Sequence, residues 1–250
     1  ELDNLVLWDT PGLGDGKEAD NRHAKNIIDK LLEVDENGNA LIDLVLVILD
    51  GGSRDLGTSY ELIDKVIIPN LGKEKENRIL VAINQADMAM KGRNWDHDKN
   101  EPNQKLVNFL EEKVRSVRDR VYEATGVTIE PIYYSAGYRE KGGEESRPYN
   151  LSKLLYYIVK ATSSEKRVIY VNNINENREM WRDDDKLLEY DEAMRKSILE
   201  SIREGASIGA SIGRDFGSGG EAIGRSIGEL IGGVIGGVIG GIFFDQGETL

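Results

Sequence analysis

Short apolar runs alternate along this chain with longer stretches in which apolar residues recur every three or four positions. The runs are rich in Val, Ile and Leu, which favours buried β-strands, whereas the longer stretches have the period of amphipathic helices. The expected strands cover residues 5–8, 41–49, 79–83 and 129–134. The expected helices cover residues 21–33, 56–68 with Pro69 as a stop, 104–124 with Gly126 as a stop, and 151–161.

This alternation of strands and helices predicts an α/β fold. Parallel strands need long crossover connections, and those connections place helices on both faces of the sheet. We therefore expect a three-layer domain with a mainly parallel sheet. In such sheets ligands bind at the carboxyl ends of the strands, so polar residues that directly follow a strand are the first candidates for a site.

Composition divides the chain into three regions. Residues 1–165 carry the alternating pattern, and residues 166–204 form a charged connector that we expect to be mainly helical. Within the connector, Arg167–Asn172 has the pattern of one more strand, and Asp183–Asp185 is an acidic run suited to a helix start. Residues 205–250 form a tail that holds 15 of the 28 glycines.

Three short polar motifs each follow an expected strand. They are Asp9-Thr10-Pro11-Gly12, Asn84-Gln85-Ala86-Asp87 and Ser135-Ala136-Gly137. Taken singly, each has an ordinary interpretation as a strand-to-loop turn, because Asp, Asn, Ser, Pro and Gly are common turn residues. Taken together, their order, their spacing and their positions after strands favour one shared ligand site.

In this arrangement the motifs resemble the Era-like branch of the translation-factor-class GTPases, which belong to the P-loop NTPase fold. Residues 5–16, 78–88 and 132–137 carry the resemblance, which covers about residues 1–165. It implies a small-GTPase-type G domain that binds GTP or GDP with Mg²⁺. The branch is often described as a 50S-ribosome-binding GTPase domain, so the ribosome is an expected partner by family analogy.

The resemblance also implies a role for each motif residue. Asp9 would reach Mg²⁺ through a water molecule, and the Gly12 amide would approach the terminal phosphate. Asp87 would accept two hydrogen bonds from guanine and Asn84 would tie neighbouring loops together. Gln85 stands where the family usually has a Lys packed on the base. In the Ser135 loop, the Ala136 amide would face the guanine oxygen.

The family's phosphate loop, Gly-x-x-x-x-Gly-Lys-Ser/Thr, is absent from this sequence. Gly16-Lys17 and Gly72-Lys73 are each followed by Glu. The chain begins about where the family's third strand begins, so we expect a truncated G domain that lacks a central strand between residues 5–8 and 41–49. Arg167–Asn172 is a candidate to fill that gap. We expect weak or no GTP binding and impaired or absent hydrolysis by the chain alone.

We assign no catalytic residue. In some family members a Gln that orients the attacking water follows the motif glycine, but here that position is Leu13, which cannot hold a water. Whether the chain is an enzyme is therefore left open by the sequence.

The tail has a four-residue glycine period, which lets two helices pack closely in the manner of a glycine zipper. Through residues 205–244 it could associate with a membrane surface or form a homo-oligomer. The uncharged run 230–244 would span about 22 Å as a helix, short of the ~30 Å hydrocarbon core. A flexible low-complexity tail and a helical hairpin packed on its own domain are the alternatives.

Charge and cysteine content narrow the function classes. A formal net charge of −13 argues against direct binding to DNA through a basic surface. The absence of cysteine excludes disulfides and thiolate metal sites, and no basic-then-apolar leader opens the sequence. We expect a cytoplasmic protein that associates with a membrane only if its tail does so. The rival to nucleotide binding is a non-enzymatic, GTPase-like scaffold assembled by the tail.

Overall fold

A computed structural model describes residues 5–14, 16–139, 145–167, 177–194, 196–198 and 200. The predicted tail, 205–250, lies outside the described residues, as does nearly all of the predicted strand Arg167–Asn172. The chain is a mixed α/β protein that divides into two compact units. One unit consists of residues 7–149, and the other of residues 1–6 and 150–250.

A parallel sheet of three strands lies at the centre of the 7–149 unit. Its strands are β1 (Val45–Asp50), β2 (Ile79–Asn84) and β5 (Ile132–Tyr133), in the order β1-β2-β5. The register pairs Val47 with Val81 and Ile83 with Tyr133. The parallel pairing and the strands expected over 41–49, 79–83 and 129–134 are confirmed, although β5 is only two residues long.

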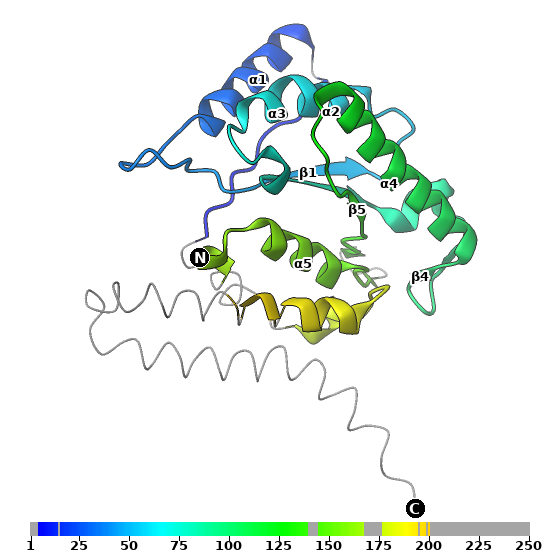
Figure 1. Ribbon diagram of the computed structural model, residues 1–250. Coiled ribbons are helices and arrows are strands. Elements are labelled where there is room, and N and C mark those ends of the chain that lie inside the picture. Colours follow the sequence, from blue (N-terminus) through cyan, green and yellow to red (C-terminus); the bar gives the residue numbers. More distant parts are fainter. Residues whose placement is uncertain are drawn as a thin grey trace, which may run out of the picture. The chain divides into compact units, whose positions relative to one another are not determined.

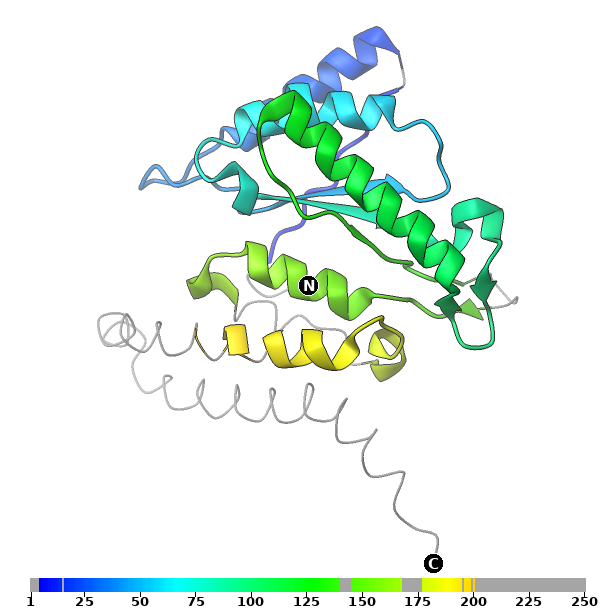
Figure 2. The same ribbon diagram turned by 45° about the vertical axis from the view of Figure 1, so that its right-hand side comes forward.

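Helices of the same unit cover one face of this sheet, as Figures 1 and 2 show from two directions. They are α1 (Lys17–Leu31), α2 (Gly57–Glu61), a π-helical stretch (Leu62–Ile67), α3 (Ile68–Asn70) and α4 (Gln104–Thr125). Their apolar side chains form one core with alternate residues of the strands, among them Val47, Leu49, Val81 and Ile83.

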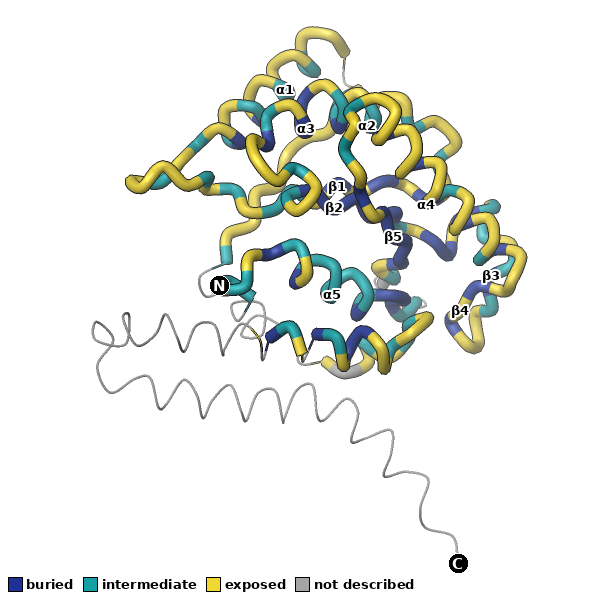
Figure 3. Tube along the Cα trace, in the orientation of Figure 1, coloured by how far each residue is buried: buried dark blue, intermediate teal, exposed yellow. Residues whose placement is uncertain are grey.

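The longest helix, α4, follows its sequence pattern closely. The Asn103 side chain caps it by accepting from the amides of Lys105 and Leu106, and Gly126 ends it in the left-handed conformation at φ 71°. One face of the helix is buried and the other exposed, as the colours in Figure 3 show. The buried residues are Leu106, Leu110, Val114, Val117 and Val121.

The helix expected over residues 56–68 is present, but Pro69 does not stop it. The helical backbone continues to Asn70 and widens into a π-helix just before the proline. Proline has no N–H to donate to the carbonyl four residues earlier, and a π-turn is one way for a helix to absorb that loss. The core residues Ile63, Val66 and Ile67 lie on the widened segment.

The prediction that residues 5–8 form a strand is wrong. The segment has no regular secondary structure, and Val6, Leu7 and Trp8 are 73%, 75% and 58% exposed. An isolated apolar segment is not a stable strand, because strands require a neighbouring backbone. Among the described residues β1 has a single partner, β2, and on the face away from the helices its Ile48 is 56% exposed.

Two small hairpins were not anticipated from the sequence. In the first, β3 (Trp95–Asp96) pairs antiparallel with β4 (Glu101–Pro102), and in the second, β6 (Tyr138–Arg139) pairs with β7 (Glu145–Ser146). Short 3₁₀ segments cover Lys75–Asn77 and Ala86–Gly92.

From residue 150 onward, the regular structure in the described part of the second unit is helical. It contains α5 (Leu151–Ala161), 3₁₀ turns at Ser164–Lys166 and Arg178–Trp181, and helical residues 187–194. The acidic run Asp183–Asp185 caps the first turn of α5. The Asp184 carboxylate accepts hydrogen bonds from the amides of Ser152 (3.3 Å) and Lys153 (3.0 Å). No helix in the described part of the chain has both the length and the apolar composition needed to cross a membrane.

Candidate functional site

Asn84 ends strand β2 and links two loops at the carboxyl edge of the sheet. Its side-chain oxygen accepts from the amide of Gln85 at 2.8 Å and from the amide of Ala136 at 3.1 Å. Ala136 follows strand β5, which pairs with β2. The loop-tying position expected for Asn84 is therefore present, and the two polar motifs after β2 and β5 lie side by side.

Asp87 and Ser135 form the most buried polar pair of this group. The Ser135 hydroxyl donates to Asp87 Oδ1 at 2.6 Å. Ser135 is 3% exposed and Asp87 is 9% exposed. The Gly137 amide in turn donates to the Ser135 oxygen at 3.3 Å. A short hydrogen bond from a hydroxyl to a carboxylate is among the stronger kinds in proteins, so it holds Asp87 in one orientation.

Backbone bonds fix the same loop. The Ala86 amide donates to the Tyr134 carbonyl at 3.1 Å, and the Tyr134 amide donates to the Ile83 carbonyl at 2.9 Å. Gln85, the residue before Ala86, adopts the left-handed conformation at φ 58°, and its side chain is exposed. This strained residue turns the chain so that Asp87 returns towards Ser135, while the Gln85 side chain points to solvent.

A third loop, which follows β1, contributes residues that belong to none of the three sequence motifs. The Gly51 amide donates to the Asn84 carbonyl at 2.7 Å, and a Cβ at Gly51 would lie 2.6 Å from that oxygen. Only glycine permits this close approach. The sequence signal for this loop is Asp50-Gly51-Gly52 directly after a strong strand, which the three motifs did not include.

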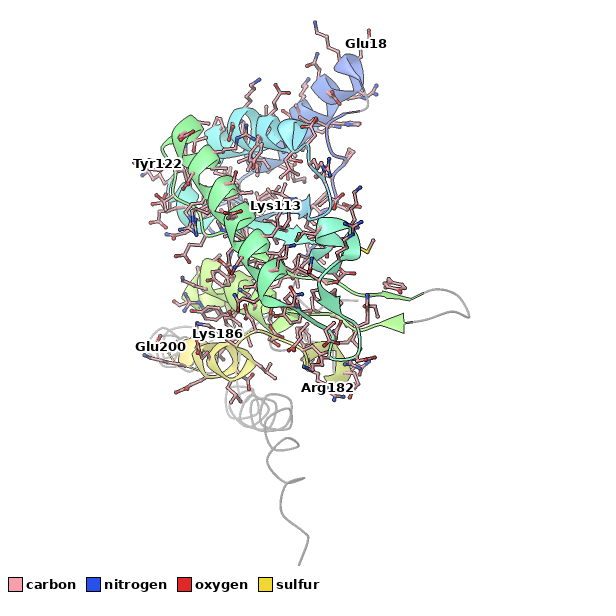
Figure 4. The ribbon with its side chains drawn as sticks, turned by 90° about the vertical axis from the view of Figure 1, so that its right-hand side faces the viewer. Glu18, Lys113, Tyr122, Arg182, Lys186 and Glu200 are labelled. Atoms are coloured by element: carbon pink, nitrogen blue, oxygen red, sulfur yellow. The ribbon has the colours of Figure 1, made fainter. Side chains whose placement is uncertain are left out.

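Lys113 holds this loop from α4, where Figure 4 labels it. Its ammonium group donates to the carbonyls of Asp50 (3.2 Å), Gly51 (2.7 Å) and Ser53 (2.8 Å). Burial lowers the pKa of the Lys113 ammonium, and the nearby Asp50 charge partly opposes this. No sequence signal marks Lys113, because about sixty residues separate it from its acceptors.

The first motif makes its hydrogen bonds with α1. Asp9 and Gly12 are exposed on an irregular segment before α1. Two contacts from α1 hold the segment: His23 Nδ1 lies 3.2 Å from the Gly12 carbonyl, and the Gly14 amide donates to Asp20 at 2.7 Å. The described residues show no hydrogen bond between Asp9 or Gly12 and the loops that carry Asn84 and Ser135. Hydrogen bonds among the described residues thus join Asn84, Gln85, Asp87, Ser135 and Ala136, and they do not extend to Asp9 or Gly12.

The five hydrogen-bonded residues after β2 and β5 form a polar group at the carboxyl edge of the sheet. It places one buried carboxylate and an amide side chain at the carboxyl ends of two parallel strands, where ligands bind in α/β sheets. The N–H groups of Gln85, Ala136 and Gly137 donate within the group itself. In the described part of the chain, no three His, Asp or Glu side chains converge as a metal site. Comparison of the sequence and structure with protein-family models, curated proteins and solved structures finds no match.

Proposed function

We propose that the chain binds guanine nucleotides at the carboxyl ends of β2 and β5, on a small-GTPase type of fold. The observation that carries the proposal is the Asp87 carboxylate, which is 9% exposed and oriented by Ser135. An ionised carboxylate accepts about four hydrogen bonds, and Ser135 uses one of them. The remaining capacity suits the two adjacent N–H donors on the edge of guanine.

Selectivity would follow from the same carboxylate. Adenine offers a ring nitrogen acceptor where guanine offers an N–H donor, so a bound adenine would leave the buried Asp87 oxygen unpaired. The Ala136 amide, which donates to Asn84 Oδ1 at 3.1 Å in this structure, would exchange that bond for one to the guanine oxygen. The exposed Gln85 would contribute weak packing on the base in place of a Lys.

The phosphates and Mg²⁺ would be held less well. Mg²⁺ in such sites is bound by one or two carboxylates together with substrate phosphates. Asp9 is one exposed carboxylate on a separate segment, and the sequence contains no phosphate-loop motif. We therefore propose weak nucleotide binding by this chain, with Asp9 and Gly12 as the phosphate-side candidates, and hydrolysis impaired or absent.

Isothermal titration with GDP, GTP and ATP in the presence of Mg²⁺ tests this proposal. Binding of the guanine nucleotides without binding of ATP is the expected result. The variant Asp87→Asn should lose GDP affinity by tenfold or more and gain affinity for XDP, because xanthine presents an acceptor where guanine has its amino group. Asp98→Asn, on the exposed end of the β3–β4 hairpin, is the matched control.

Three results would overturn the proposal. Equal affinity for ATP and GDP would place the ligand away from Asp87, and retained GDP binding by Asp87→Asn would do the same. If no nucleotide binds, the non-enzymatic scaffold becomes the better account of the chain.

A further inference from the structure

The β3–β4 hairpin carries a buried asparagine that belongs to none of the motifs. Asn100 is 5% exposed and adopts the left-handed conformation at φ 56°. Its side-chain amide donates to the carbonyls of Arg147 at 3.1 Å and Pro148 at 3.0 Å. Asn tolerates positive φ better than other residues with a side chain, so this one residue supplies both the turn and the two donors.

The segment that Asn100 holds is the one that pairs with the Ser135 loop. Tyr149, the next residue along the chain, exchanges two backbone hydrogen bonds with Ser135, at 2.9 and 3.0 Å. The Ser135 hydroxyl then orients Asp87. A continuous series of contacts therefore runs from Asn100 through residues 147–149 to the candidate base-binding carboxylate.

Two further contacts tie the same parts together. The Trp95 ring, on the same hairpin as Asn100, meets the Tyr149 ring edge to face, with centroids 5.3 Å apart and an interplanar angle of 85°. The backbone of Gly137 packs so closely on the Ser146 carbonyl that a Cβ could not be accommodated. The hairpin thus supports residues 147–149, and residues 146–149 support the loop of Ser135–Gly137.

We propose that Asn100 is a positioning residue, which fixes the Ser135–Gly137 loop and, through Ser135, the orientation of Asp87. The part of this inference that concerns ligand affinity rests on the proposed guanine-nucleotide function, whereas the part that concerns the loop does not. Loss of the two amide hydrogen bonds frees residues 147–148, and the Tyr149–Ser135 pairing then opens more often.

Asn100→Gly is the test variant, because glycine keeps the positive φ while removing both donors. Asn100→Asp is the second variant, since it keeps the size of the side chain and lacks the donors. Asn94→Gly is the matched control: Asn94 is a half-buried residue beside the same hairpin with φ 70°, and its side chain bonds to Met90 and Asn103 instead.

The first measurement is amide hydrogen exchange by NMR on the full chain. In Asn100→Gly and Asn100→Asp, the amides of Ser135 and Tyr149 should exchange about tenfold faster than in the unmodified chain, as expected for lost hydrogen bonds. The amides of Val81 in β2 and Leu110 in α4 should be unchanged. In Asn94→Gly all four amides should keep their rates.

Unchanged exchange at Ser135 and Tyr149 would overturn the proposal. So would equal acceleration of all four amides, because this would show that Asn100 contributes to global stability alone.

The second measurement is GDP titration of the same variants. Asn100→Gly should weaken GDP binding about tenfold while Asn94→Gly leaves it unchanged. If the unmodified chain binds no GDP, the proposed function fails, and the exchange data alone decide whether Asn100 positions the loop. If the unmodified chain binds GDP and the loop opens without loss of affinity, the positioning role towards the ligand is refuted.

Discussion

The hydrogen bond between Ser135 and Asp87 should contribute measurably to folding as well as to binding. Ser135→Ala removes a donor that lies 2.6 Å from a carboxylate only 9% exposed. Hydrogen bonds to charged groups contribute about 1.5–3 kcal/mol, and a buried acceptor left unpaired costs a similar amount. We therefore expect Ser135→Ala to lower the free energy of unfolding by about 2 kcal/mol.

A double-mutant cycle with Asp87→Ala isolates this interaction, because alanine leaves no acceptor for the Ser135 hydroxyl. Urea unfolding followed by tryptophan fluorescence measures it. With a slope of about 1–3 kcal/mol per molar urea, a loss of about 2 kcal/mol moves the midpoint by about 1 M. The coupling energy between the two substitutions should exceed about 1 kcal/mol. Ser53→Ala is the control, because the Ser53 hydroxyl makes an exposed bond to a neutral carbonyl at 2.8 Å.

A coupling energy below about 0.5 kcal/mol would refute the reasoning, since contacting groups in one hydrogen-bonded pair couple by more than that. It would mean that the Ser135 hydroxyl does not orient Asp87, and the proposed base-binding geometry would lose its support.

Three further predictions concern other parts of the chain. Gly137→Ala should lower the melting temperature by several degrees, because Gly137 has φ 70° and an added Cβ meets the Ser146 carbonyl; calorimetry measures this, and an unchanged value contradicts it. Burial raises the pKa of Asp184 to about 6, so its contribution to stability is present below about pH 4 and is lost as the pH rises through 6, by up to about 3 kcal/mol. Unfolding curves at pH 4.5 and 7.5 test this prediction. Asp184→Asn should reduce the difference in unfolding free energy between the two pH values. Ile48→Thr should reduce binding of an apolar dye while changing the unfolding free energy by less than about 0.5 kcal/mol, because Ile48 is 56% exposed; a large loss of stability would show that its side chain is covered.

Local periodicity determined most of the elements. The apolar spacing along 104–124 matched α4, the Val- and Ile-rich run before Asn84 matched β2, and the helix over 151–161 was found with its bounds. These patterns were readable because burial of one helical face, or of both faces of a parallel strand, leaves a repeat in the sequence. The position of polar residues directly after strands also predicted that the Asn84 and Ser135 motifs meet at the sheet edge, but the same rule failed for the first motif, whose expected strand does not form.

Contacts between residues far apart in the chain were decided only by the tertiary structure. Residues 5–8 have the composition of a strand, yet they do not form one, because a strand depends on a neighbouring backbone that local sequence cannot supply. Lys113 and Asn100 donate hydrogen bonds to carbonyls some sixty and forty-seven residues away in the chain. The sequence around a single Lys or Asn does not indicate which distant carbonyl it will contact. The sequence by itself therefore determined most of the helices, the central strands and the two loops after β2 and β5, whereas the packed fold decided which side chains hold those loops in place.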